Sequence, residues 1–233
     1  YRFSMASIDH RGSEAFVSRN NRSFVLVPRH DSFELVNLPM PWYTFSGQEA
    51  KIELGVKNAA AGNDFATSLA VRDSQLGMLL GYLSSGDLGA AKEFSGIAEE
   101  MLYVKTANHL AAAAGAYAMV GTAVDNKGRN WHAWIRNLCE WFPTMPDGAI
   151  ILGQLYLRMR RTPAELEEAR KLFKIGFERG LPYYSMGFRW LLEGLEMMAP
   201  GDPQAEKMSA KLRTLARRLH PQSPFTILRL DAG

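Results

Sequence analysis

Hydrophobic and polar positions follow two different periods along the chain, and the change of period divides it. In residues 1–57, short runs of alternating and β-branched residues are separated by turn signals such as Asn20-Asn21 and Pro39 to Pro41. These runs predict four or five strands, at 15–17, 23–27, 33–38, 42–45 and 52–56. We therefore expect residues 1–57 to form a small antiparallel β unit. It should pack on other parts of the protein, because a few short strands bury only a marginal core.

Beyond an expected junction at 59–63, the hydrophobic period becomes about 3.6 residues, which is typical of amphipathic helices. The pattern predicts helices at 69–84, 88–104, 107–124, 130–142, 147–160, 163–179, 183–198 and 203–219. Thr162, Pro163 and Glu165 form a strong helix start, with a capping side chain, a proline at the first position and an acidic first turn. Residues 64–220 are thus expected to form an α-helical repeat domain. Residues 221–233 form a C-terminal extension that adds a strand or docks on the rest.

Glycine recurs inside or beside the later predicted helices. A glycine in a helix costs about 1 kcal/mol relative to alanine, and close approach of a neighbouring helix is the usual compensation. The positions are Gly148, Gly153, Gly176, Gly187 and Gly194. They predict tight helix–helix contacts.

Two of the predicted hairpins resemble tetratricopeptide repeats. Residues 147–182 carry the family's small-and-large pattern at Leu152-Gly153, Tyr156, Ala169, Phe173, Gly176 and Pro182. Residues 78–104 carry it at Tyr82, Gly86-Asp87, Ala91 and Ala98. The other two hairpins keep little of it beyond Gly115 in one, and Gly187 and Trp190 in the other. The resemblance implies a mainly α fold, a short tetratricopeptide-like α-solenoid of about four helical hairpins preceded by the small antiparallel β unit.

In such repeats the first helix of each hairpin lines a concave face that holds a protein or peptide. The resemblance therefore implies a set of partner-binding residues with polar tips or aromatic rings on those helices. They are Tyr82, Asn108, Tyr117, Gln154, Arg158, Tyr184 and Arg189.

Residues 138–158 and 180–195 are also similar to helical regions that trail bacterial caspase-like or other peptidase domains. The chain contains no catalytic motif of such a peptidase, so no catalytic residue follows from this similarity. Because the chain starts at Tyr1 without a methionine, we expect either a piece cut from a longer polypeptide or a processed or partly ordered chain. An accessory region of an enzyme encoded upstream is therefore an alternative function.

Composition excludes few classes of protein. The net charge is +3 and the hydrophobic fraction is 47%, which is ordinary for a globular protein and gives little support to nucleic-acid binding. No apolar run approaches the roughly 20 residues of a membrane span. Cys139 is the single cysteine, which excludes an internal disulfide and favours a reducing compartment. We expect a cytoplasmic protein without a membrane partner.

No constellation of residues predicts a catalytic, cofactor or metal site. Cys139 and His132 lie seven residues apart on one predicted helix, about 10 Å along its axis, beyond hydrogen-bond reach. The five histidines are scattered without metal-ligand spacing, and neither glycine-rich phosphate loops nor a nucleophile elbow occur. We expect Cys139 to be a buried structural thiol.

Aromatic residues crowd 131–142, and basic residues crowd the last predicted helix. Trp131, Trp134, Trp141 and Phe142 at helical spacing favour a core, with a peptide groove as the alternative. The basic helix favours a solvated face or an acidic partner, with phosphate binding as the alternative. The sequence thus favours a non-catalytic protein-interaction or regulatory scaffold that binds another protein or another domain of its own chain. Nucleic-acid binding through the last helix remains a third hypothesis.

Overall fold

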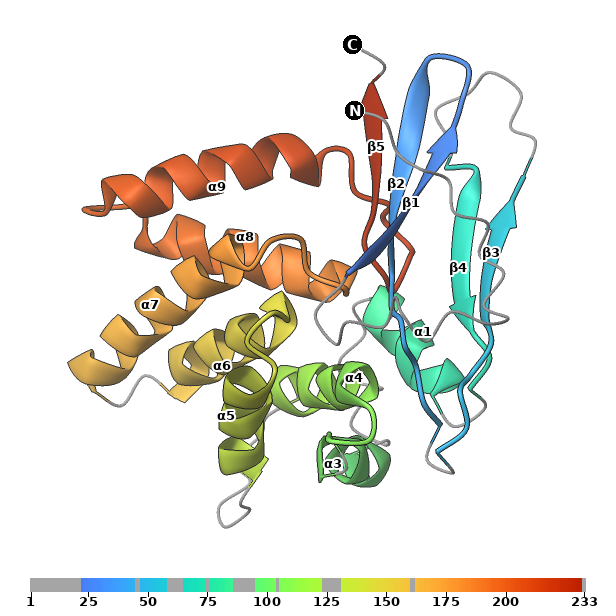
Figure 1. Cartoon of the computed structure of the whole chain (residues 1–233). Coiled ribbons are helices and arrows are strands. Elements are labelled where there is room, and N and C mark those ends of the chain that lie inside the picture. Colours follow the sequence, from blue (N-terminus) through green and yellow to red (C-terminus); the bar gives the residue numbers. More distant parts are fainter. Residues whose placement is uncertain are drawn as a thin grey trace.

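The structure is a computed structural model that describes residues 22–44, 47–57, 65–73, 76–85, 95–103, 105–122, 131–159 and 162–231. Within these residues it is mainly helical, with small antiparallel sheets, as the sequence predicts. The helices lie on one side of the molecule and the strands on the other (Figure 1). The strand expected at 15–17 and the junction expected at 59–63 lie outside the described residues.

Two antiparallel sheets make up the β part. The first has the order β1-β2-β5 and the second pairs β3 with β4. The strands are β1 (Ser23–Pro28), β2 (Ser32–Leu38), β3 (Ile52–Val56), β4 (Thr67–Val71) and β5 (Ile227–Asp231). The expected strands at 23–27, 33–38 and 52–56 are confirmed, and of the two alternatives for the C-terminal extension the structure shows the strand, β5. In the expected run 42–45, Tyr43 forms only an isolated bridge with Glu49.

The prediction that a helix starts at residue 69 is wrong. Residues 67–71 form β4, in which burial alternates strictly, with Thr67, Leu69 and Val71 inside. Helix α1 begins only at Gly77. These residues form a strand and not a helix because β4 pairs with β3 along its whole length.

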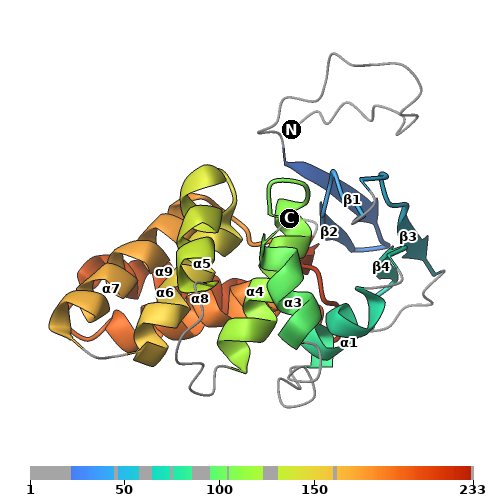
Figure 2. The ribbon, with the colours of Figure 1, turned by 90° about the horizontal axis from the view of Figure 1, so that it is seen from below.

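The described helices agree with the remaining predictions, although residues 88–94 of the helix expected at 88–104 lie outside the described residues. They are α1 (Gly77–Ser85), α3 (Ser95–Tyr103), α4 (His109–Gly121), α5 (Trp131–Trp141), α6 (Pro146–Met159), α7 (Pro163–Glu178), α8 (Ser185–Met198) and α9 (Pro203–Ala216). At α7 the Thr162 hydroxyl accepts from the backbone N–H of Glu165 at 3.2 Å, and the Glu165 carboxylate accepts from the N–H of Thr162 at 2.9 Å. Seen from below, the helices extend from α1 beside the strands to α7 at the far end (Figure 2).

Helices α6, α7 and α8 meet at the positions where glycine was expected to permit close approach. A Cβ on Gly153 would lie 3.2 Å from the Phe173 ring, and one on Gly194 would lie 2.5 Å from the same ring. A Cβ on Gly176 would lie 2.7 Å from Ile150. The predicted tight contacts are confirmed, because the ring of Phe173 takes the space that two side chains would occupy.

The C-terminal segment joins the sheet to the helices. The backbone N–H of Ser185, at the start of α8, donates to the carbonyl of Pro224 at 3.0 Å, and Thr226 N–H donates to the carbonyl of Tyr183 at 2.8 Å. A ring contact extends this junction, since the rings of Phe225 and Trp42 meet edge to face with 6.1 Å between their centroids. Strand β5 then enters the sheet beside β2. The start of α8 is therefore covered by the end of the chain.

Candidate protein-binding surface

Three of the residues expected to line a groove lie in the interior. Tyr117 and Tyr184 have no exposed surface and Asn108 is 4% exposed. The Tyr184 hydroxyl donates to the carbonyl of Leu110 at 2.7 Å, and the Asn108 side chain caps α4 by accepting from Ala111 N–H at 2.9 Å. The expectation that these three side chains touch a partner is corrected. The ring of Phe225 packs 5.3 Å from that of Tyr184 and covers this end of α8.

The other expected groove residues are engaged in part within the chain. Arg158 donates to the carbonyl of Gly121 at the end of α4 at 3.0 Å, and its guanidinium lies 5.7 Å above the ring of Trp190. Arg189 donates to the carbonyl of Pro221 at 2.8 Å. Gln154 is half-buried on α6. Tyr82 belongs to α1, and its side chain lies outside the described part of the structure.

Asp147 is a buried carboxylate that the sequence did not single out. It accepts hydrogen bonds from the Tyr117 hydroxyl at 2.9 Å and from the backbone N–H groups of Tyr183 and Tyr184 at 2.8 and 3.2 Å. Burial raises the pKa of this carboxyl, while the three hydrogen bonds act in the opposite direction. Gly187 leaves the necessary space, because a Cβ there would lie 2.1 Å from the Tyr117 oxygen. The site links α4, α6 and the start of α8, and Asp147 has no exposed surface.

A second buried carboxylate, Glu34, joins the two sheets. It accepts from the backbone N–H groups of Ala66 and Thr67 at 2.9 and 2.8 Å and forms an ion pair with Arg29. Burial alone would raise the pKa of Glu34, but the hydrogen bond from the Thr67 hydroxyl, together with those from Ala66 N–H, Arg29 and Thr67 N–H, lowers it below the usual value overall. Glu34 therefore holds β4 against β2 as a charged group.

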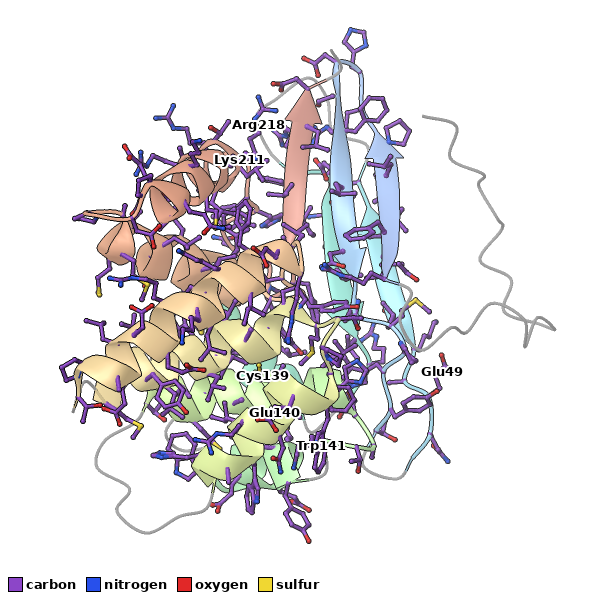
Figure 3. All side chains as sticks on the ribbon, turned by 60° about the vertical axis from the view of Figure 1, so that its left-hand side comes forward. Glu49, Cys139, Glu140, Trp141, Lys211 and Arg218 are labelled. Atoms are coloured by element: carbon purple, nitrogen blue, oxygen red, sulfur yellow. The ribbon has the colours of Figure 1, made fainter. Side chains whose placement is uncertain are left out.

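Aromatic side chains form an exposed surface where α3 meets α5. We call Tyr103, Trp134 and Trp141 the aromatic surface. Tyr103 is 65% exposed and Trp141 is 53% exposed, while Trp134 is half-buried. The ring of Tyr103 lies edge-on to that of Trp134, with 5.3 Å between centroids. Figure 3 labels Trp141 at the end of α5, next to Glu140. Exposed tyrosine and tryptophan rings of this kind often anchor protein interfaces.

The amphipathic pattern of α5 turns part of its aromatic residues outward. Trp131, Ile135, Leu138 and Cys139 are buried, and they form the stripe that packs on the core. Trp141 lies beside that stripe, at the last residue of the helix, where neighbouring helices no longer cover it. The expectation of a core therefore holds for Trp131, whereas Trp141 is on the surface.

The connection between α3 and α4 supports the aromatic surface from beneath. The ammonium group of Lys105 lies 4.9 Å from the centre of the Trp141 ring, and His109 stacks on Phe142 with 4.6 Å between centroids. Burial lowers the pKa of Lys105 and lowers the pKa of His109 to about 4. The imidazole is therefore neutral at pH 7, which suits a ring that stacks at the first position of a helix, where positive charge is unfavourable.

Sequence reasoning missed Tyr103, the most exposed ring of this surface. The sequence held an indication of its exposure, because Tyr103 follows the buried pair Met101 and Leu102 and therefore lies outside the buried stripe of α3. The partner ring Trp134 comes from another helix. The pairing could not be deduced from one helix alone.

Cys139 is buried as expected, and burial raises the pKa of its thiol. Within the described ranges, no group of three His, Cys, Asp or Glu side chains could hold a metal ion. None of the described helices is long and apolar enough to cross a membrane.

Some basic residues in and just after the last helix form ion pairs within the chain. Arg213 pairs with Glu196 at 2.8 Å, and Arg218 pairs with Asp231 on β5. Figure 3 labels Lys211 on α9 and Arg218 beside β5. The pairing reduces the positive charge that this face can present to phosphates.

The fold and this surface define a mainly helical domain with a small sheet and an exposed aromatic surface. A family model described as the Y4kD C-terminal domain matches residues 78–228. This is well over half of the chain, which therefore belongs to that family. The match begins in α1 and ends in β5, so it includes every described helix and the aromatic surface. No curated protein and no solved structure matches the chain.

Proposed function

We propose that this domain is a non-catalytic protein-interaction scaffold whose helices form a short, tetratricopeptide-like α-solenoid. The observation that carries the proposal is the aromatic surface, where Tyr103 and Trp141 expose more than half of their area. Large rings at such exposure are costly in water and are typical of surfaces that a partner covers. The partner is a protein, or another domain of the same polypeptide.

The packing order of the helices supports the solenoid part of the proposal. Helix α6 packs on both α4 and α5, and α8 packs on both α6 and α7, while α9 contacts α7 and α8. Each first helix of a hairpin thus contacts both helices of the preceding hairpin, as in stacked repeats.

The binding surface in this proposal is not the concave face that the repeat resemblance implied. Tyr117 and Tyr184 from that face are buried, and Arg189 contacts the returning segment at Pro221. The partner instead binds the side of the stack formed by α3 and α5.

The test compares wild-type protein with a Tyr103→Ala/Trp141→Ala double variant, each immobilised and used to capture proteins from cells that carry the natural gene. A partner captured by the wild type is then purified, and its affinity for both proteins is measured by calorimetry. We expect a loss of at least about tenfold in the double variant, since aromatic anchors often contribute 2 kcal/mol or more.

Met197→Ala serves as the matched control, because Met197 is a similarly exposed apolar residue (51%) on α8, outside the aromatic surface. Circular dichroism establishes that all variants are folded. Equal affinity of the purified partner for the wild type and the double variant would refute the aromatic surface as the binding site.

The family description supports a second candidate. It names a C-terminal domain, which favours an accessory role in which the partner is another domain of a longer polypeptide. The parent reading frame tests this. If the natural protein begins just before Tyr1, the accessory role is excluded and a separate protein must be the partner.

A further inference from the structure

We infer that the aromatic surface binds a basic segment of its partner, with arginine or lysine side chains stacked separately on the exposed rings of Trp141 and Tyr103. The inference rests on the proposed function, because it names the chemistry of the partner at the same surface. It follows from three observations on the rings, the surrounding charges and the cations already present.

The first observation concerns the rings. The face of an indole or phenol ring attracts a cation, most strongly for tryptophan. Trp141 already binds one cation in this way, the ammonium of Lys105 at 4.9 Å. More than half of Trp141 remains exposed on other sides. An incoming guanidinium can therefore reach ring surface that the chain itself leaves open.

The second observation concerns the acidic residues that border the surface. On α3, the exposed Glu100 precedes Tyr103 by three residues, so it shares the side of the helix that carries Tyr103. On α5, Glu140 is exposed beside Trp141, as Figure 3 shows. These carboxylates flank the rings from two helices. Their charge is complementary to a basic segment and opposes an acidic one.

The third observation concerns the cations near the rings, among the described residues. The Arg136 guanidinium donates to the Tyr156 hydroxyl on α6 at 2.9 Å. Lys105 is only 5% exposed and lies beneath Trp141. His109 is neutral near pH 7, since burial lowers its pKa to about 4. Among the described residues that border the rings, Glu100 and Glu140 are exposed carboxylates, and Arg136, one turn before Glu140, offsets part of their charge.

The experiment measures binding of the whole chain to fluorescein-labelled peptides by fluorescence anisotropy. One peptide alternates arginine with serine. A second has citrulline in place of arginine, which keeps the shape but removes the charge, and a third has glutamate. We expect the arginine peptide to bind at least about tenfold more tightly than the citrulline peptide and the glutamate peptide not to bind. Added salt should weaken the arginine complex.

Charge-reversal variants locate the site. Glu100→Lys/Glu140→Lys should weaken the arginine peptide at least about tenfold, and Trp141→Ala should do so as well. Glu178→Lys, an exposed glutamate at the end of α7, is the matched control and should bind as the wild type does. Circular dichroism confirms that each variant is folded.

The failures of the two proposals are distinguishable. Equal binding of arginine and citrulline peptides, absence of binding by either, or full binding by the Glu100→Lys/Glu140→Lys variant would overturn the basic-segment inference. Each of these results leaves the scaffold proposal open to its own test. That proposal fails only if the natural partner binds equally well after both exposed rings are removed.

Discussion

Replacing Gly115 by alanine tests the contact that positions α3, and with it Tyr103. A Cβ at Gly115 would lie 2.5 Å from the backbone carbonyl oxygen of Ala98 on α3. Ordinary contact begins near 3.4 Å, so the two helices would have to separate by about 0.9 Å. No side-chain rotation can relieve this clash, because the atom on the α3 side belongs to the backbone.

Two effects of opposite sign set the expected magnitude. Alanine in place of glycine gains about 1 kcal/mol in a helix interior. Overpacking of a close contact costs about 1 to 3 kcal/mol. Gly115→Ala should therefore change the free energy of unfolding by between about zero and −2 kcal/mol. Gly81→Ala isolates the first effect, because Gly81 is exposed within α1 and no described atom lies within 4 Å of a Cβ there.

Urea denaturation followed by far-UV circular dichroism gives both free energies of unfolding, provided that the slopes of the transitions agree. Gly81→Ala should be more stable than the wild type by about 1 kcal/mol, and Gly115→Ala less stable than Gly81→Ala by about 1 to 3 kcal/mol. Equal stabilisation by both substitutions would show that α3 and α4 are not in close contact at Ala98. The reasoning about the position of Tyr103 would then be wrong.

Three further predictions concern single side chains. His109 has a folded-state pKa of about 4 against 6.5 for the free side chain. The folded protein therefore has its full free energy of unfolding above pH 6.5, where the imidazole is neutral in both states, and loses part of it as the pH falls toward 4. The loss amounts to at most about 3 kcal/mol. The free energy of unfolding of His109→Gln, measured across this pH range, should not show this loss. The same pH dependence in the wild type and the variant would contradict the lowered pKa of His109. Tyr117→Phe should cost about 1.5 to 3 kcal/mol, because it removes a buried hydrogen bond to the Asp147 carboxylate, and an unchanged urea midpoint would exclude that bond. Thr162→Ala should lower the melting temperature through loss of about 1 kcal/mol of capping, whereas Thr214→Ala, an exposed threonine inside α9, is the comparison that should change little.

The sequence predicted most of the helical part because several helices carry their own boundary signals, such as the capping side chains of Asn108, Thr162 and Asp202. The capping box at Thr162 and the proline at 163 define the start of α7 within the chain itself. Strand β4 was missed because Leu69 and Val71 fit both a helical and an alternating pattern. Pairing with β3, which comes from earlier in the chain, decides between them.

The candidate site was harder to predict for a related reason. Tyr117 and Tyr184 are suitable for a groove by residue type, but the returning segment around Phe225 buries the helix start that carries Tyr184. Periodicity along one helix cannot show which distant segment will cover it. Trp141 was recognised within an aromatic cluster, yet its exposure depends on where α5 ends relative to its neighbours.

The order β1-β2-β5 also determines how the domain responds to mechanical force. Ser23 pairs with Leu38 at one end of β2, and Asp231 pairs with Ser32 at the other end. Tension applied between Arg22 and Asp231 would therefore pull β1 and β5 in opposite directions along the two sides of β2. Backbone hydrogen bonds in this geometry are loaded together in shear, whereas strands peeled from one end break their bonds one at a time. A partner that pulled on the flanking chain would thus meet its greatest resistance at this small sheet, while the helices between β4 and β5 remained shielded from the load.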